Sequence, residues 1–584
     1  MLRLSTYTAR QTQQILYGYT LRYATGLDTQ AVTTMSDEAS IQLTPYEEEV
    51  FDFLLQVVNA HTPDTVLRVA GGWVRDKLLS WESHDIDIAL NNLSGIAFAE
   101  LVQAEMEASG MATHSIGKIK ANPEQSKHLE TATMLIKGSW VDFVNLRSEE
   151  YGESRIAVSK PGTPQEDAER RDLTINALFY NINTRSIEDF TGQGLRDLAD
   201  GTIRTPLAPK KTFMDDPLRI LRAFRFASRF AYTLVPEMEA AMHDTEVLAA
   251  LASKVSRERY GLELAGMLRG PSPLASLAYV SHFGVAPIVF DVPGQGGASG
   301  NEEGGEDLTF PAKALWSAGA FFALTDGWKG AEDDASAAPP VKLVPLSKDG
   351  EDPERDGHSK GGSAPYAEVI ADGESVMDAL RINAYLAAYL LPRMDDEIAV
   401  KKNRMQSLPF YHITSSIKRS KDDATWVERV HALAREFRSV LDGSQEGNRT
   451  SLGLMLRMGV KHHWDISLGL AVISLALARQ DPGMVEPPFS IHEPIERVLE
   501  LCTIPDDLFQ AHAELYAQID QLVQGTPPWK LKPALDGNEI KSALGLSKGG
   551  KVIGEVTRAL IEAQLSGVEY DADGWGGWVR ERFA

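Results

Sequence analysis

The spacing of hydrophobic residues changes once along the chain, and this change limits the folds that the chain can adopt. From about residue 44 to residue 198, segments with apolar residues at every second position, such as HDIDIAL and WVDFVNL, alternate with segments of helical spacing. After Asp215 the spacing is helical almost throughout. A period of two is typical of half-buried strands, and a period of three to four is typical of helices. We therefore expect an α+β protein with an N-terminal α/β head, in which helices cover a small mixed sheet, followed by an all-helical neck, body and tail.

The chain has 584 residues, which is more than one hydrophobic core accommodates, so several domains are expected. We place their boundaries as follows: head 44–200, neck 201–275, body 276–520 and tail 521–584.

Within the body, residues from about 292 to 365 are rich in Gly, Ser, Asp and Glu. Such a composition buries too little apolar surface to order itself, so we expect a disordered acidic insert, with one short helix over KALWSAGAFFALTDGW. The whole chain carries a net charge of -24, which argues against a protein that coats nucleic acid non-specifically. Any RNA would have to find a local basic track.

The first 34 residues differ from the rest of the chain. They contain Arg3, Arg10 and Arg22, many Ser and Thr, and no acidic residue before Asp28. This composition resembles a mitochondrial transit peptide, and a disordered polar terminus is the alternative. Met35 opens the acidic segment MSDEAS, so initiation at Met1 would give a mitochondrial form and initiation at Met35 a form in the cytoplasm or nucleus. No apolar run is long enough to span a bilayer, and a single cysteine excludes an internal disulfide.

Asp85 and Asp87 are the centre of the expected chemistry. Residues two apart on a strand point to the same face, so both carboxylates project together while Ile86 and Ile88 enter the core. Adjacent carboxylates repel each other, and a divalent cation relieves this repulsion. Mg²⁺ prefers oxygen ligands and is bound by one or two carboxylates, with water and substrate phosphate filling the other positions. A solvated strand edge is the alternative for an isolated Asp-x-Asp.

The surrounding motifs favour the metal site. Gly71 and Gly72 follow a strand and precede a helical segment, where glycines allow a tight turn and a close approach of the backbone to a triphosphate. Asp142 lies in a further alternating segment, WVDFVNLR. This order of Gly-Gly, Asp-x-Asp and a third acid resembles the nucleotidyltransferase superfamily of polymerase β.

Later motifs narrow the resemblance. The segment ERRD (169–172), read as the start of a helix, is followed by GQGLRDL (192–198), DDPLR (215–219) and SRERYGLEL (256–264). Together with RVAGGWVRD and HDIDIAL, this series resembles the class II CCA-adding enzymes, closely over residues 67–264, and HLETATMLIKGSWVDFVNLRSEEY resembles their eukaryotic branch. The resemblance implies template-independent addition of CCA to the 3′ end of tRNA from CTP and ATP, by two-metal nucleotidyl transfer that releases pyrophosphate.

Asp216 and Arg219 are expected to read the base. Three residues apart on a helix, they would share a face. A carboxylate accepts hydrogen bonds and a guanidinium donates them, which complements the amino group and ring nitrogen of cytosine and of adenine. Uracil and guanine present the opposite pattern and would be rejected. An ion pair within a packed helix is the alternative. The family has Glu where this chain has Asp215, whose shorter side chain is still expected to orient Arg219.

The resemblance also implies roles for several other residues. Asp85, Asp87 and Asp142 would be catalytic and would bind Mg²⁺. A nucleotide-binding set would comprise Gly71, Gly72, Arg75, Arg171, Asp172, Asn176, Asp216, Arg219 and Arg222. Within it, Arg75 is a phosphate clamp or a surface salt bridge, and Arg171 and Asp172 would contact ribose hydroxyls. The loop GKIKANPEQSK resembles the loop linked to switching from C to A addition.

The tRNA surface is harder to place from sequence. KKNRM (401–405) and IKRSK (417–421) are basic clusters that would contact tRNA phosphates or would be solvated helix faces. Two other functions stay open, a bacterial-type poly(A) polymerase and a non-catalytic tRNA-binding protein. No obligate protein partner and no membrane association are expected.

Overall fold

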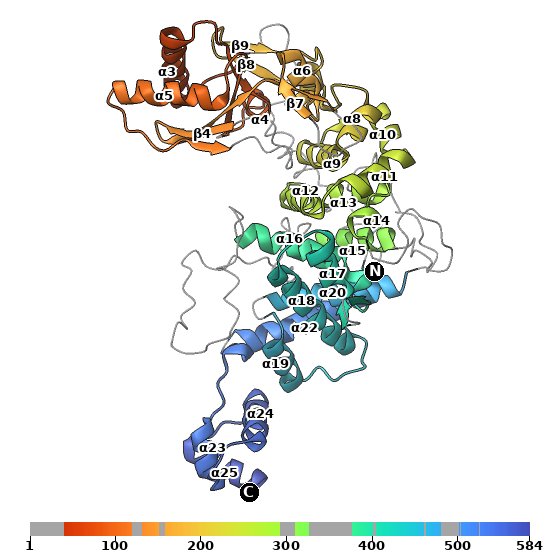
Figure 1. Ribbon diagram of the computed structural model, residues 1–584. Coiled ribbons are helices and arrows are strands. Elements are labelled where there is room, and N and C mark those ends of the chain that lie inside the picture. Colours follow the sequence, from red (N-terminus) through yellow and green to blue (C-terminus); the bar gives the residue numbers. More distant parts are fainter. Residues whose placement is uncertain are drawn as a thin grey trace. The chain divides into compact units, whose positions relative to one another are not determined.

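The computed structural model describes residues 40–83, 85–119, 131–150, 158–291, 310–325, 376–400, 404–460, 463–480, 502, 504–524 and 526–584. The expected transit peptide, Met35 and most of the loop at 117–127 lie outside these residues. The described chain forms two compact units that meet in sequence between Val289 and Phe290. The first contains a sheet and a helical neck, and the second is a helical body and tail (Figure 1), which confirms the expected α+β class.

The head is built on a mixed sheet of seven strands in the order β3-β4-β5-β2-β1-β8-β9. Its elements are α3 (Pro45–His61), β1 (Leu67–Ala70), α4 (Gly72–Leu78), β2 (Ile86–Leu90), α5 (Gly95–Ala108), β3 (Gly117–Ile119), β4 (Thr131–Ile136), β5 (Ser139–Asn145), β6 (Arg147–Glu150), β7 (Val158–Pro161), α6 (Pro164–Glu169), the 3₁₀ turn η2 (Thr174–Asn176), β8 (Phe179–Asn181) and β9 (Ser186–Glu188). Strands β2 and β5 are parallel, and the other pairs in this sheet are antiparallel.

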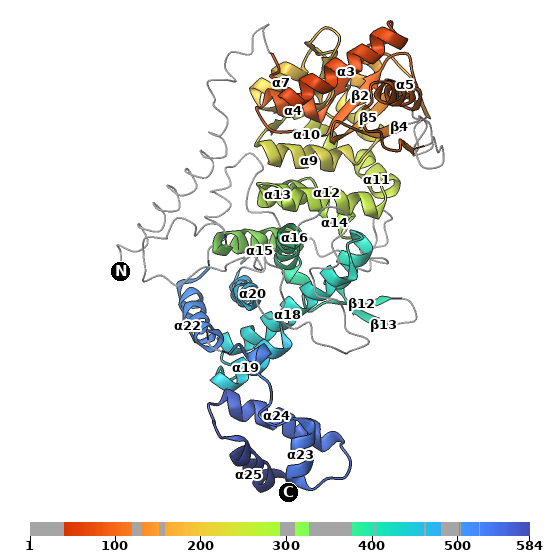
Figure 2. The same ribbon diagram turned by 90° about the vertical axis from the view of Figure 1, so that its left-hand side faces the viewer.

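One face of the sheet is covered by α3 and α5 (Figure 2), and the apolar side chains of β2, β4 and β5 point towards these helices. Phe98 of α5 packs edge-on against Phe143 of β5, with ring centroids 5.2 Å apart. Along β2 and β5 the burial alternates, because successive side chains point to opposite faces. The carboxylates of Asp87 and Asp142 therefore lie on the face opposite to α3 and α5.

Glu47 joins α3 to α4. It completes a capping box with Thr44, and its Oε2 also accepts a hydrogen bond from Nζ of Lys77 at 2.7 Å. Oε1 accepts one from the indole N–H of Trp73 at 3.0 Å. Burial raises the pKa of Glu47, but the hydrogen bonds from Lys77 and Thr44 outweigh this effect, and the pKa ends below its ordinary value. This buried carboxylate holds the helix that follows Gly71 and Gly72.

The neck is made of short helices and one two-stranded parallel sheet. Its elements are α7 (Gly194–Asp200), β10 (Thr202–Ile203), α8 (Pro209–Asp215), α9 (Arg219–Phe230), β11 (Thr233–Leu234), α10 (Pro236–Met242), α11 (Thr245–Lys254), α12 (Arg257–Arg269), α13 (Pro273–His282) and α14 (Ala286–Val289). Helix α13 packs against α9. Phe283, which directly follows α13, stacks on Phe224 of α9. The neck was expected to end at 275, whereas this compact unit continues to Val289.

The second unit contains the body and the tail. The body elements are α15 (Phe310–Thr325), α16 (Val376–Tyr389), η4 (Leu391–Arg393), β12 (Glu397–Val400), β13 (Arg404–Ser407), α17 (Leu408–Tyr411), the π turn η6 (His412–Ser416), α18 (Lys421–Leu441), α19 (Arg449–Met458), α20 (Trp464–Ala478) and α22 (Asp506–Val523), and η8 (Pro528–Lys530) follows. The antiparallel pair β12–β13 departs from the expected all-helical body. Helix α15 lies within the expected acidic insert, and its Trp316 is fully buried against the body.

The tail has a small core of its own. Helices α23 (Gly537–Leu544), α24 (Lys551–Leu565) and α25 (Ala572–Phe583) surround the buried side chains of Ile540, Val556, Leu560 and Trp575. Within the described part of the chain, no helix is both long enough and apolar enough to cross a bilayer.

We predict that Glu47→Ala loosens the head locally. The substitution leaves Lys77 and the Trp73 indole without their buried acceptor, a loss of about 3 kcal/mol by comparison with other broken buried pairs. Hydrogen exchange of segments 45–61 and 72–78, followed by mass spectrometry, should show faster exchange. Because the folded pKa of Glu47 is lowered, its stabilisation is present above the pKa of an unfolded glutamate and is lost as the pH falls through the folded value.

The matched control is Glu49→Ala on the same helix. Glu49 forms an exposed ion pair with Lys137, and exposed pairs contribute little. Exchange should therefore be nearly unchanged in this variant. Equal exchange rates in Glu47→Ala and the wild type at neutral pH would contradict the role of Glu47.

Candidate active site

The carboxylate centre is formed by the pairing of two strands. The parallel register of β2 and β5 places Asp87 directly beside Asp142. Asp85 precedes β2 by one residue and shares the face of Asp87, and both are exposed. Ile86 and Ile88 point to the opposite face and are buried. The structure thus brings the three acids that the sequence singled out to one face of the sheet.

The electrostatics of this centre suit a cation. Restricted hydration raises the pKa of Asp87, the charges of Asp142 and Asp85 raise it further, and the charge of Arg171 partly opposes them. Oδ1 of Asp142 is buried and accepts no hydrogen bond from the residues that the structure describes. A buried carboxylate oxygen without a donor is costly, and a bound cation would remove this cost. The residues present therefore fit a divalent metal ion.

These carboxylates supply only part of a coordination sphere. Within the described residues, no three His, Cys, Asp or Glu side chains gather closely enough to hold a metal ion by themselves. We expected three carboxylates to converge on one ion. In the structure Asp87 and Asp142 form the adjacent pair, and Asp85 acts on Asp87 through its charge. This limit agrees with magnesium chemistry, in which substrate phosphate and water supply the remaining oxygens.

The glycine turn lies beside the carboxylates. Gly71 has a positive φ of 74°, and a Cβ atom there would lie 2.7 Å from Nη1 of Arg171. Only glycine combines this backbone conformation with so close an approach. The N–H of Gly71 donates to the carbonyl of Leu178 at 3.0 Å, so it is not available to donate to a phosphate. Gly71 instead leaves room for the guanidinium of Arg171. Gly72 begins α4.

Arg75 was expected to be a phosphate clamp or to form a surface salt bridge, but in the structure its side chain is buried. It is 4% exposed, donates to the side chains of Asn176 and Asp76, and lies against the rings of Phe226 and Phe230 of α9. A guanidinium held in this way has no open path to a substrate. The expectation for Arg75 is therefore corrected, and the residue fastens α4 to the neck.

Asp172 and Asn176 belong to the same buried connection. The segment expected to start a helix is instead the end of α6 followed by the 3₁₀ turn η2, because Asp172 accepts the N–H of Leu173 and so breaks the helical pattern. Oδ1 of Asp172 also accepts from Asn176 at 3.1 Å, and Oδ2 forms an ion pair with Arg222 at 2.6 Å. Burial raises the pKa of Asp172, but Arg222 and Asn176 outweigh burial, and the pKa ends below its ordinary value.

Arg222 continues this connection into α12. Besides Asp172, it contacts Glu263 at 3.4 Å, and Glu263 also pairs with Arg225 at 2.7 Å. Asp172 is 8% exposed, which leaves its carboxylate little access to a ribose. The pair Asp172–Arg222 therefore positions the site, and the expected ribose contact by Asp172 is not supported by its burial.

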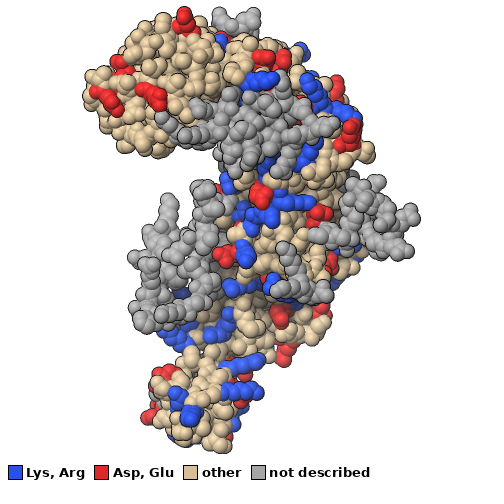
Figure 3. Space-filling model, in the orientation of Figure 1, with Lys and Arg blue, Asp and Glu red and all other residues tan. Residues whose placement is uncertain are grey.

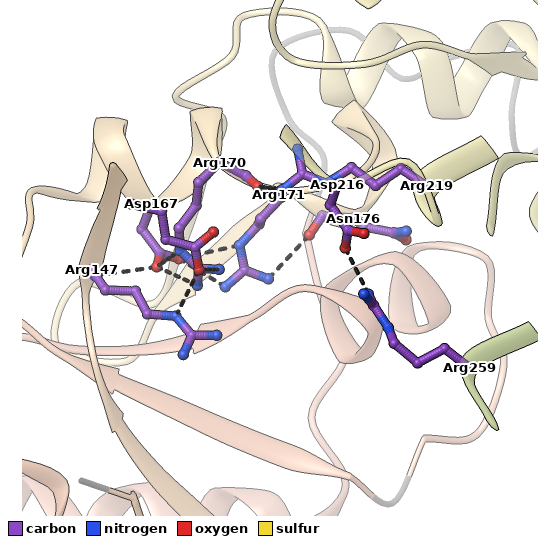
Figure 4. A network of polar contacts seen from close by, with 9 residues as sticks. Arg147, Asp167, Arg170, Arg171, Asn176, Asp216, Arg219 and Arg259 are labelled. Atoms are coloured by element: carbon purple, nitrogen blue, oxygen red, sulfur yellow. Dashed lines mark hydrogen bonds and ion pairs between the residues drawn. The ribbon is translucent and has the colours of Figure 1, made fainter. Parts of the chain in front are cut away.

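Arg171 remains beside the carboxylates. Its guanidinium donates to Asp167 at 2.9 Å and to the carbonyl of Asn176 at 3.3 Å (Figure 4). It also lies over the ring of Phe179. Its charge acts on Asp87. Among the residues expected to bind the nucleotide, Arg171 is thus held at the edge of the metal-binding face.

Asp216 and Arg219 do not share a helix. Asp216 terminates α8 in an extended conformation because Pro217 follows it, and α9 begins at Arg219. Oδ2 of Asp216 accepts a hydrogen bond from Arg259 of α12 at 2.7 Å, and Oδ1 accepts the N–H of Leu218 at 3.2 Å (Figure 4). Arg219 donates to the carbonyl of Arg170. The two expected base-reading residues therefore lie at adjoining helix ends, each held by a different partner.

Asp215 lies close enough to Arg219 for an electrostatic interaction. Burial raises the pKa of Asp215, and the charge of Arg219 opposes this rise. The expected role of Asp215 in orienting Arg219 stays a prediction.

Two arginines were missed by the sequence reasoning. Arg147 follows the apolar alternation of β5 and lies near Arg170 and Asp87; restricted hydration and the charge of Arg170 lower the pKa of Arg147. Arg259 lies in the quoted segment SRERYGLEL, but its spacing gave no sign of its partner Asp216.

The basic clusters of the body are described in part. Lys401 and Lys402 lie outside the described residues. Arg419 forms an ion pair with Asp423 at 3.2 Å and is largely buried, whereas Lys418 and Lys421 are exposed. In Figure 3 basic side chains gather along the helical parts of the chain, while the head around α5 shows mainly uncharged and acidic ones.

Comparison with known proteins shows that this head is similar to the heads of nucleotidyltransferases. Residues 67–204 match the family of the poly A polymerase head domain. The mitochondrial CCA tRNA nucleotidyltransferase of Saccharomyces cerevisiae is 54% identical over 229 residues, which are 38% of this chain and 42% of that protein. The corresponding protein of Candida glabrata is 48% identical over 262 residues, 43% of this chain and 49% of that one. The chain thus spans about half the length of the relatives it matches.

The fold is also similar to that of a solved structure. The CCA-adding enzyme of Thermotoga maritima complexed with tRNA has a TM-score of 0.54 and 18% identity, and the match covers 95% of this chain and 98% of that one. At this identity the likeness concerns the fold alone. Within the matched head, the adjacent carboxylates of Asp87 and Asp142 are suited to a divalent metal ion. Residues 67–204 are thus similar to the head domain of poly A polymerases, in a chain that is similar over part of its length to CCA tRNA nucleotidyltransferases and in fold to a CCA-adding enzyme.

Proposed function

We propose that this protein adds CCA to the 3′ end of tRNA, using CTP and ATP and releasing pyrophosphate. The observation that carries the proposal is the register that sets Asp87 beside Asp142 on the open face of a poly A polymerase head. The 54% identity to a CCA tRNA nucleotidyltransferase supports the choice of substrate.

The chain's own residues would divide the work as follows. Asp87 and Asp142 would hold Mg²⁺, with Asp85 adding its charge beside them, and the ion supplies Lewis-acid activation of the RNA hydroxyl and of the α-phosphate when bound. Arg147 and Arg171 would face the triphosphate, because their positive charges lie next to the same carboxylates. The reaction is then largely a matter of position and charge, as phosphoryl transfer requires.

Base selection would fall to Asp216 and Arg219. Each oxygen of a carboxylate has two acceptor sites, so Asp216 can accept from Leu218 and Arg259 and still accept the amino group of cytosine or adenine. We infer that Arg259 fixes the direction in which Asp216 presents its remaining acceptor sites. Uracil and guanine would place a carbonyl against this carboxylate and would be rejected.

Two other functions make different predictions. A poly(A) polymerase of bacterial type would add long A tails, whereas a CCA-adding enzyme would incorporate CTP and then a single ATP into tRNA that lacks CCA. A non-catalytic tRNA-binding protein would incorporate neither nucleotide. Incubation of the purified protein with such a tRNA and single labelled nucleotides separates the three.

For location, we propose the mitochondrion for the form that starts at Met1 and the cytoplasm or nucleus for a form that starts at Met35. The composition of residues 1–34 and the mitochondrial relatives support the first part. Fusion of residues 1–34 to a reporter tests import, and a reporter that stays outside mitochondria would contradict it.

We predict that Asp87→Asn and Asp142→Asn each lower the rate of CTP incorporation at least about a thousandfold, the equivalent of about 4 kcal/mol in the activation free energy. Each change removes a charge that the metal needs. Binding of tRNA should be largely preserved, because the phosphate contacts lie elsewhere.

The matched control is Asp200→Asn, which removes an exposed carboxylate paired with Arg196. Its turnover should equal that of the wild type. Turnover in Asp87→Asn that matches this control would disprove the metal assignment.

We further predict that Arg259→Gln weakens base selection. Loss of a charge-assisted hydrogen bond worth about 1.5–3 kcal/mol should lower kcat/KM for CTP and ATP by about ten- to a hundredfold and reduce discrimination against UTP and GTP. Arg196→Gln removes an exposed arginine and serves as the control. A proportional loss with all four nucleotides would show that Arg259 supports the fold and has no part in specificity.

A further inference from the structure

We propose that Trp140 is a stacking platform for the terminal base of the acceptor RNA. This inference rests on the proposed function and adds to it a binding residue for the second substrate. It follows from where the strand register puts an exposed indole with respect to the carboxylates and the glycine turn.

Trp140 lies on the face of the sheet that carries the metal-binding residues. On β5 it is two residues before Asp142, so both side chains point the same way. The pairing of Ile86 with Val141, continued by one residue, sets Asp85 beside Trp140 just as Asp87 lies beside Asp142. On the other side, Leu135 of β4 is the partner of Trp140. The indole is therefore the lateral neighbour of the first carboxylate.

The order of the strands assigns the two substrates to different sides of β2. Strand β1 flanks β2 on one side, and β5 flanks it on the other. The glycine turn follows β1 and holds Arg171 close, which puts the triphosphate of the nucleotide on that side. The attacking hydroxyl must come from the opposite direction, in line with the departing pyrophosphate. That direction lies over β5, where Trp140 and Asp142 are.

The chemistry of the indole suits a nucleic-acid base. Trp140 is 59% exposed, although a tryptophan is usually well buried. An aromatic ring accepts any base on its face, so it can bind successive 3′ ends that finish in different nucleotides. This tolerance is needed by an enzyme whose acceptor end changes with each addition. A polar contact to one base would bind only one of these ends.

The hairpin that carries Trp140 is held in place. The hydroxyl of Tyr46 on α3 donates to the carbonyl of Ile136 at 2.9 Å, and the indole is flanked by paired strands on both sides, β2 and β4. The indole is thus presented by a β4–β5 hairpin that lies within the sheet and is anchored to α3, so stacking requires little ordering of the protein. A platform of this kind acts by positioning the acceptor and takes no part in bond making.

The test compares Trp140→Ala with Trp140→Phe in the full-length protein. Base–aromatic stacking predicts a KM for tRNA lacking CCA that rises about five- to a hundredfold in the alanine variant, with the KM for CTP unchanged. Phenylalanine should restore the KM for tRNA to within about threefold of the wild type, because it keeps a π face. Met458→Ala, which removes another exposed apolar side chain, should leave both constants unchanged.

A second readout does not depend on turnover. An acceptor RNA with 2-aminopurine as its last base should lose fluorescence on binding the wild type and Trp140→Phe, and lose less on binding Trp140→Ala. A higher KM for CTP with an unchanged KM for tRNA would place Trp140 over the nucleotide and overturn the proposal. Unchanged constants and equal quenching would also overturn it, whereas a wild type that extends no tRNA would refute the proposed function itself.

Discussion

The parallel pairing of β2 with β5 is the interaction on which the site depends. It sets the register that puts Asp87 beside Asp142, and it joins two strands between which β3 and β4 intervene in the sequence. A slip of one residue would turn one of these carboxylates into the core, because side chains alternate between faces. The apolar faces of both strands, packed under α3 and α5, fix the register by making such a slip bury charge. The core of the head thus specifies the geometry of the face that carries the carboxylates.

A second set of contacts holds the neck against that face. Arg75 of α4 inserts between Asn176 and the aromatic rings of α9, and Asp172 pairs with Arg222. Both contacts are charged or polar and buried, so removing one partner would leave the other unsatisfied. The proposed base-reading residues at the start of α9 are thereby tied to the same segment that carries Arg171. This buried connection sets the distance between the metal-binding face and the base-reading residues. Arg75 and Arg222, which were expected to contact the substrate, instead contact other residues of the protein to make this connection.

The sequence predicted local features well and long-range partners poorly. Strands around Asp87 and Asp142 follow from the period of two, and the positive φ at Gly71 agrees with a glycine turn. Arg75 was assigned wrongly because its burial is caused by Phe226 and Phe230, which lie some 150 residues later. The helix break at Asp216 had a local cause, since a residue before proline avoids the α conformation. The ion pair between Asp216 and Arg259 had no local cause in the sequence, because it depends on how α12 packs against α9.

The chain as a whole is acidic, but the site beside Asp87 carries a local group of arginines that can bind an anionic substrate. Around Asp167 one carboxylate serves two guanidinium groups, those of Arg170 and Arg171, and the pKa of Arg147 is lowered first by burial and then by the charge of Arg170. This excess of positive charge lies next to Asp87, whose pKa is raised by restricted hydration and by its acidic neighbours. Opposite charges so arranged favour a ligand that brings both a cation and an anion, and a metal-bound nucleoside triphosphate is such a ligand. The net charge of -24 belongs to the whole chain, and screening by salt over about 10 Å limits the effect of distant charges on the site.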